Sequence, residues 1–130
     1  TPKPSSAASD VYKRQILNVV SKAGIMGSKR NHSHYASSKA GLIGLTKSLA
    51  RETAEYGITV NAIAPGYMKT DMLMKSFKDK KDEEEQNKKI PIGRIADPRE
   101  VANAAVFLVS ERASYFTGIT FDATGGMLMR

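Results

Sequence analysis

The sequence predicts an α/β protein with a parallel sheet, because strand patterns alternate with helical patterns along the chain. Residues 16–20 and 58–64 are short apolar runs rich in β-branched residues, as in buried strands. Between them, residues 33–56 carry leucines at helical spacing. Parallel strands need a crossover connection of this kind, and a helix usually supplies it.

The first strand and the long helix have recognisable ends in the sequence. The strand delivers Ser21 at its C-terminal end, and a polar loop containing glycines leads to the helix. The helix is predicted to stop at Gly57, a residue type favoured just past a helix end. Gly41 and Gly44 lower the helix propensity, and we expect them to allow close packing.

The second half of the chain continues the alternation. The second strand is ended by Pro65-Gly66, and a third, shorter strand is predicted over 119–122. Residues 97–100, Asp-Pro-Arg-Glu, combine an N-cap, a first-turn proline and a capping-box glutamate, which predicts a helix through about Val109. Because that helix is apolar on more than one side, we expect it to be well buried.

The composition is typical of a soluble, cytoplasmic protein. Of the 130 residues, 41% are hydrophobic and none is cysteine, and no apolar run approaches the roughly 20 residues that span a bilayer. The net charge is +7, of which +5 lies in the first 34 residues, where six Lys and Arg face one acidic residue. A basic excess in a tail and a loop, without interleaved aromatic residues, argues against nucleic-acid binding.

Residues 1–14 differ from the rest of the chain. They are rich in Ser, Pro and Ala and have no apolar period, so we expect a disordered tail. The tail is interpreted as a cloning or assembly scar, with a genuine short leader as the alternative. The folded part is then predicted to cover residues 15–130.

Tyr35 and Lys39 are the first candidates for chemistry. They are four residues apart, so a helix places them on one face. A free phenol has a pKa of about 10, and a neighbouring cation favours its charged form, which suits general acid–base work. Ser21 would hold a carbonyl or alcohol oxygen against the phenol. On spacing alone, a helical surface pair and a strand-ending serine are the simpler interpretations.

Further motifs follow Lys39 in order. They are AGLIGLTKSLARE over 40–52, GITVNAIAPG over 57–66, Thr70-Asp71-Met72, Pro-Ile-Gly-Arg over 91–94, and Gly125-Gly126. From about Gln15 to Arg130 the chain resembles the C-terminal half of the short-chain dehydrogenase/reductase (SDR) family, and within it the 3-oxoacyl-acyl-carrier-protein reductase group. The resemblance implies a Rossmann-type, doubly wound parallel sheet. No glycine-rich phosphate-binding turn occurs in the 130 residues, so we expect the N-terminal strands to be lacking.

The resemblance also implies a role for each site residue. Tyr35 matches the tyrosine that transfers a proton, Lys39 the lysine that assists it and binds the nicotinamide ribose, and Ser21 the serine that orients the substrate. The cofactor would be NADP, with NAD as the alternative. Its nicotinamide would lie against the turn formed by Pro65, Gly66, Met68 and Thr70. The Met68 backbone would receive the carboxamide, and Thr70 would help to hold that amide or the phosphates.

The implied function is NAD(P)-dependent reduction of a ketone or 3-oxoacyl thioester, free or on an acyl carrier protein, as in fatty acid biosynthesis. The full-length parent would be a homodimer or homotetramer. Because the glycine-rich turn is missing, we expect this chain alone to be inactive. The alternatives are a non-catalytic fragment that retains the dimer-forming helices and an unstable fragment without function.

Two other segments are given structural rather than catalytic interpretations. Residues 70–90 cover the region of a family substrate lid, which would use Met72, Met74 and Phe77, while the charge run within it is expected to be a solvated helix or loop. His32 and His34 lie in a polar loop without a third ligand, so no metal site is predicted.

Overall fold

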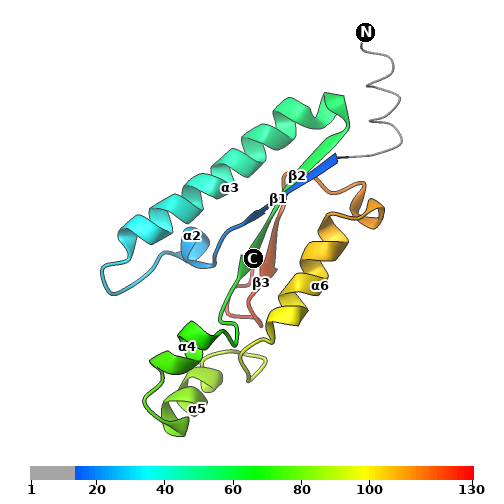
Figure 1. Ribbon diagram of the computed structural model, residues 1–130. Coiled ribbons are helices and arrows are strands. Elements are labelled where there is room, and N and C mark those ends of the chain that lie inside the picture. Colours follow the sequence, from blue (N-terminus) through cyan, green and yellow to red (C-terminus); the bar gives the residue numbers. More distant parts are fainter. Residues whose placement is uncertain (1–13) are drawn as a thin grey trace.

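The computed structural model describes residues 14–130, and its centre is a three-stranded parallel sheet (Figure 1). Strand β1 (Arg14–Val19) pairs with β2 (Ile58–Pro65), and β2 pairs with β3 (Thr120–Ala123). The predicted α/β class with a parallel sheet is confirmed. Strand β1 begins at Arg14, inside the predicted tail, and the rest of that tail, residues 1–13, lies outside the described residues.

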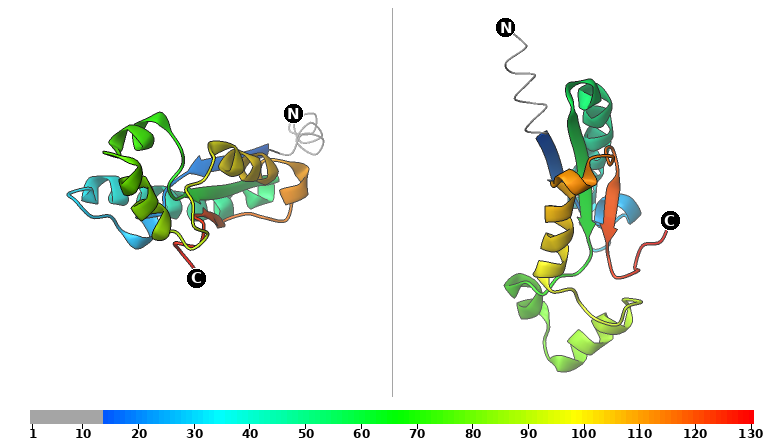
Figure 2. Two further views of the ribbon diagram at one scale, coloured as in Figure 1. Left: turned by 90° about the horizontal axis from the view of Figure 1, so that it is seen from below. Right: turned by 90° about the vertical axis from the view of Figure 1, so that its right-hand side faces the viewer.

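Two long helices cover opposite faces of the sheet (Figures 1 and 2). Helix α3 (Ser33–Thr53) follows the short helix α2 (Ala23–Met26) and leads into the 3-10 turn η1 (Ala54–Tyr56). Gly57 then adopts a left-handed φ of 71°, so the predicted stop is confirmed. Helix α6 (Pro98–Leu108) lies on the other side of the strands.

Strand β2 is buried on both faces because its alternate side chains contact different helices. Ala62 and Ala64 are fully buried on the side of α3, where small side chains let the long helix approach the sheet. Ile63 points the other way and packs with Val101 and Leu108 of α6. A central parallel strand is expected to be apolar on both faces, and β2 follows that rule.

The two crossovers of the sheet have opposite hands. The chain moves in one direction from β1 to β2 to β3, yet the connecting helices lie on opposite faces. Since roughly 98% of such connections are right-handed, one of these two takes the rare hand. The second connection is long and includes helices α4 (Asp71–Ser76) and α5 (Lys80–Lys88), and the turn η2 (Glu111–Ala113) follows α6.

Helix α6 is less buried than its composition predicts. Val101 and Leu108 face the sheet, but Val106 is 66% exposed. The prediction of a well-buried helix is wrong, because no described element covers the outer face of α6. Its predicted start is confirmed by a capping box, in which the Glu100 carboxylate accepts from the Asp97 N–H at 2.9 Å.

Two local predictions also need correction. Residues 23–26 form helix α2 where a loop was expected. Gly41 and Gly44 do not serve close packing within the chain, because a Cβ at either position would meet no atom within 4 Å. Across residues 14–130, no helix is both long and apolar enough to cross a membrane.

Candidate active site

The predicted site residues gather at the C-terminal ends of the parallel strands. Strand β1 leads into Ser21, β2 ends at Pro65, and α3 begins at this same end (Figure 1). Helices α2, α4 and α5 lie there too. In open α/β sheets the carboxyl ends of the strands form the crevice in which ligands bind.

Lys39 joins helix α3 to the end of strand β1. Its ammonium donates a hydrogen bond to the Val19 carbonyl at 3.1 Å and lies 5.7 Å from the ring centroid of Tyr35. Val19 precedes Ser21 by two residues, so this bond brings the serine-bearing end of the strand to the Tyr–Lys pair. Tyr35 is 43% exposed, which leaves its phenol open to a ligand.

The Ser21 hydroxyl is oriented by the first turn of α2. Its oxygen accepts a hydrogen bond from the Ala23 N–H at 3.2 Å. A hydroxyl that accepts in this way keeps its own proton for donation, so Ser21 can still donate to a carbonyl oxygen. The same bond holds the serine at the start of α2, so the structural and the chemical interpretations of Ser21 are compatible.

Gly24 controls how closely α2 approaches α3, and sequence reasoning did not single it out. A Cβ at this position would lie 2.7 Å from the Lys39 carbonyl carbon and 2.8 Å from the Ala40 nitrogen. The backbone of α2 therefore rests directly on the backbone of α3 at the candidate lysine. The only signal in the sequence is a glycine three residues after Ser21, which is too common to be informative.

The turn after β2 has the free groups that a carboxamide needs. The Met68 carbonyl accepts from the Thr70 N–H at 2.7 Å, while the Met68 N–H donates to no group in the described part of the chain. The Thr70 hydroxyl oxygen accepts from the Leu73 N–H at 3.2 Å and keeps a proton to donate. Gly66 brings the turn close to β3, since a Cβ there would lie 3.2 Å from the Thr124 Cα. These residues fit the nicotinamide end of a dinucleotide.

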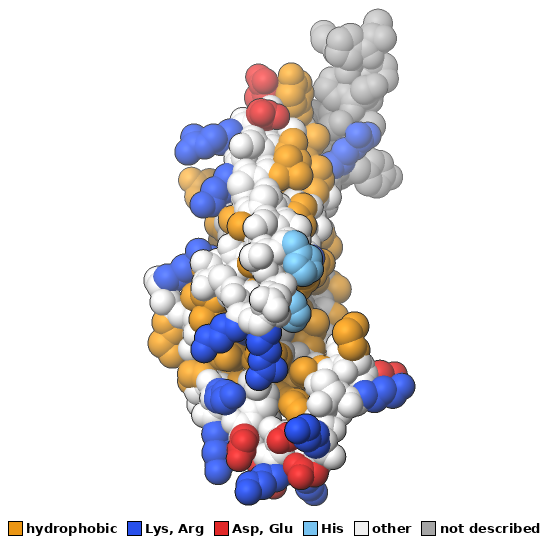
Figure 3. Space-filling model, turned by 90° about the vertical axis from the view of Figure 1, so that its left-hand side faces the viewer, with side chains coloured by type: hydrophobic (Ala, Val, Ile, Leu, Met, Phe, Trp, Pro, Cys, Tyr) orange, Lys and Arg blue, Asp and Glu red, His pale blue; other side chains and the backbone are white. Residues whose placement is uncertain are grey.

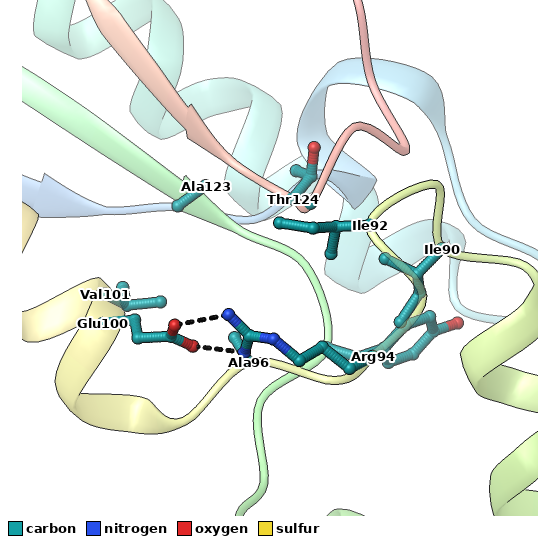
Figure 4. A pocket seen from close by; sticks show the side chains of 10 residues that line it. Ile90, Ile92, Arg94, Ala96, Glu100, Val101, Ala123 and Thr124 are labelled. Atoms are coloured by element: carbon teal, nitrogen blue, oxygen red, sulfur yellow. Dashed lines mark hydrogen bonds and ion pairs between the residues drawn. The ribbon is translucent and has the colours of Figure 1, made fainter.

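A separate pocket of about 180 Å³ lies on the α6 side of the sheet (Figure 4). The Arg94 guanidinium spans its mouth and donates two hydrogen bonds to the Glu100 carboxylate, at 2.8 and 2.7 Å. These bonds, and a third from the Asp97 N–H, lower the pKa of Glu100 to about 2. The pocket lies on the face of the sheet opposite α3, and Tyr67 of the turn after β2 is part of its lining. The Arg94–Glu100 ion pair ties residue 94 to the first turn of α6.

The predicted lid region forms two short helices with a pinned base. At that base the Lys69 N–H donates to the Ala96 carbonyl at 2.8 Å, and the Ala96 N–H donates to the Tyr67 carbonyl at 3.1 Å. The charge run forms α5, which Asp79 caps, and Met72 is 83% exposed. Closure of this region over a substrate stays a prediction.

His32 and His34 lie together at the start of α3, where His32 is the N-cap. The rings of His32 and His34 meet edge to face, with centroids 6.2 Å apart. Over residues 14–130, no group of three His, Cys, Asp or Glu side chains is arranged to hold a metal ion.

Comparison with known proteins gives consistent matches. A family model described as Enoyl-(Acyl carrier protein) reductase matches residues 6–128, and so begins inside the predicted tail. The 3-oxoacyl-[acyl-carrier-protein] reductases FabG of Vibrio harveyi and Escherichia coli are 48% and 44% identical over 115 residues. The crystal structure of Cj0485 dehydrogenase matches with a TM-score of 0.85 and 38% identity, over 92% of this chain and 48% of that one. The two FabG matches cover 88% of this chain, which spans about half (46%) of each relative.

Proposed function

Because this chain belongs to the short-chain dehydrogenase/reductase family, we propose that it carries the proton-transfer centre of a cytoplasmic NAD(P)-dependent reductase. Its substrate would be a ketone or a 3-oxoacyl thioester, which becomes the hydroxy compound. The observation that carries the proposal is the Lys39 ammonium, which contacts both the Tyr35 ring and the end of the Ser21 strand. The names of the FabG relatives support the acyl substrate, free or on an acyl carrier protein.

The residues at the strand ends divide the proposed reaction among them. Ser21 donates a hydrogen bond to the carbonyl oxygen and holds it near the phenol. When bound, the nicotinamide supplies a hydride to the carbonyl carbon. Tyr35 donates its proton to the same oxygen, which becomes the hydroxyl of the product. Lys39, held by the Val19 carbonyl, stabilises the phenolate that remains.

The cofactor would be held at its nicotinamide end by residues of this chain. The Met68 N–H and the Thr70 hydroxyl are available donors for the carboxamide oxygen or the phosphates, and Pro65-Gly66 shapes the turn beneath the ring. NADP is the proposed cofactor, with NAD as the alternative. The 130 residues include no glycine-rich turn for the pyrophosphate, so we expect no turnover by this chain alone.

A fusion protein provides the test. Residues 15–130 would be joined to the N-terminal half of the Escherichia coli relative, and consumption of NADPH would be followed with an acetoacetyl thioester. We expect the fusion to be active and Tyr35→Phe to lower its kcat by about 10²–10⁴-fold, the usual contribution of a general acid. Tyr56→Phe removes the same hydroxyl from a 65% exposed tyrosine and should change nothing. An active fusion that tolerates Tyr35→Phe would contradict the proposed role.

A second candidate function is association through the outer face of α3. Gly41 and Gly44 face open space there, and Leu45 is 47% exposed. A small, partly apolar helix face of this kind allows a second copy to approach closely, so a dimer or tetramer of the parent is proposed. Light scattering of the parent protein tests this. Leu45→Glu should dissociate the assembly, whereas Lys47→Glu, which lies two residues further on and on another side of α3, should act less strongly.

A further inference from the structure

Lys22 is a half-buried cation at the edge of the candidate site. It directly follows Ser21, and consecutive Cα atoms are about 3.8 Å apart. Its backbone N–H donates to the Pro65 carbonyl at 3.2 Å, so this residue lies between the end of β1 and the turn after β2. Within the described part of the chain, its ammonium forms no ion pair.

The ammonium of Lys22 is held over the site rather than left free in solvent. It lies 4.8 Å from the ring centroid of Tyr67, which is within the range of a cation–π contact. Tyr67 follows the Pro65-Gly66 turn, which is the proposed nicotinamide wall. The positive charge is therefore held against the residue that follows this turn, while the Lys22 backbone adjoins Ser21.

The segment that carries Lys22 is basic. Residues 14–51, which form β1, α2 and all of α3 except its last two residues, contain seven Lys and Arg and no acidic residue. On the face shown in Figure 3, acidic side chains lie at the top and in the lower part, and Lys and Arg side chains are spread between them. A site lined by one sign of charge concentrates small ions of the opposite sign.

A neutral ketone offers nothing to this ammonium, whereas an anionic group next to the carbonyl would pair with it. The Lys22 backbone adjoins Ser21 and its ammonium is held at Tyr67 of the next turn, so an anion carried by a short substrate bound at Ser21 is the kind of group that it would meet. We propose that Lys22 is a specificity-determining residue that selects short 3-oxo carboxylic acids by binding their carboxylate. This inference rests on the proposed function, because it names the substrate class of the same site.

The test compares an anionic and a neutral ligand on the 130-residue chain. Acetoacetate and the uncharged thioester S-acetoacetyl-N-acetylcysteamine would each be titrated into isotope-labelled protein at low salt, and the amide NMR signals of residues 21–24 and 67 followed. We expect acetoacetate to shift these signals and Lys22→Met to weaken its binding about tenfold or more, the loss of one charge-assisted hydrogen bond. Lys22→Arg should restore binding. Lys29→Met, which removes an exposed charge from the same loop region, should leave it unchanged.

Each contrary outcome has a definite meaning. If acetoacetate moves none of these signals, or if Lys22→Met binds it as tightly as the wild type, the inference is wrong. Equal weakening by Lys29→Met would show a general charge effect and would overturn it as well. This NMR measurement needs neither cofactor nor turnover. If the fusion is active through Tyr35 but Lys22→Met binds acetoacetate as the wild type does, only the inference is refuted. A fusion without activity would instead count against the proposed function.

Discussion

Substituting Gly24 by alanine tests whether the contact between α2 and α3 builds the candidate site. The new Cβ would lie 2.7, 2.8 and 2.9 Å from three atoms of Lys39 and Ala40, two of which belong to the backbone. Ordinary contact begins at 3.4 Å, so the two helices would have to separate by about 0.7 Å, the difference between 3.4 and 2.7 Å. A backbone cannot rotate away as a flexible side chain can.

We expect Gly24→Ala to lower the free energy of unfolding by about 0.5–2 kcal/mol. Overpacking costs about 1–3 kcal/mol, and the gain in helix propensity offsets about 0.5–1 kcal/mol of it. The matched control is Gly41→Ala, where a Cβ meets no atom within 4 Å. That substitution should raise the stability by about 0.5–1 kcal/mol, because only the propensity term applies.

Thermal unfolding of the purified chain, followed by circular dichroism, measures both variants. The two melting temperatures should differ in opposite directions from the wild type, each by a few degrees. In the fusion protein, Gly24→Ala should also lower kcat, because Ser21 moves relative to Lys39, and a misplacement of about 1 Å can cost roughly 10²-fold. A Gly24→Ala protein as stable and as active as the wild type would refute the reasoning.

Two further predictions concern a buried threonine hydroxyl and the loss of stability at acidic pH. Thr46 is fully buried, donates to the Leu42 carbonyl at 2.7 Å and accepts from the Asn18 amide at 3.0 Å. In denaturant unfolding, Thr46→Val should lower the free energy of unfolding by about 1–3 kcal/mol, whereas Thr46→Ser should retain most of the stability. Equal unfolding midpoints for Thr46→Val and the wild type would contradict this prediction. The pKa of Glu100 is lowered from 4.5 to about 2 in the folded protein, chiefly by Arg94, so the carboxylate contributes stability that is complete above about pH 4.5 and is lost as the pH falls through about 2. The difference in melting temperature between wild type and Glu100→Gln should therefore shrink over that range, and a difference independent of pH would refute this.

The chain's local patterns predicted most of its elements. The Asp97–Glu100 capping box and the Gly57 stop are contacts between residues a few positions apart, so their residue types are sufficient signals. The apolar run of β2 likewise reflects burial on two faces. The motif around Tyr35 and Lys39 located the candidate site, and the roles of its residues stay predictions.

Features that join distant segments could not be predicted in this way. The bond from Lys39 to the Val19 carbonyl links positions 20 residues apart, and Lys22 meets Tyr67 across two strand ends. The exposure of Val106 depends on which element covers α6, and no pattern within the helix contains that information.

The sequence by itself therefore determined the α/β class, the order of the three strands and the two long helices, and the residues on which the chemistry is proposed to rest. These follow from hydrophobic period, capping and motif, which act over a few residues. Only the tertiary structure decided that α2 rests on α3 at Gly24, that the two crossovers differ in hand, and that Lys22 stands over Tyr67. The physical reason is that packing between segments depends on how whole elements meet in space, which local residue preferences do not specify.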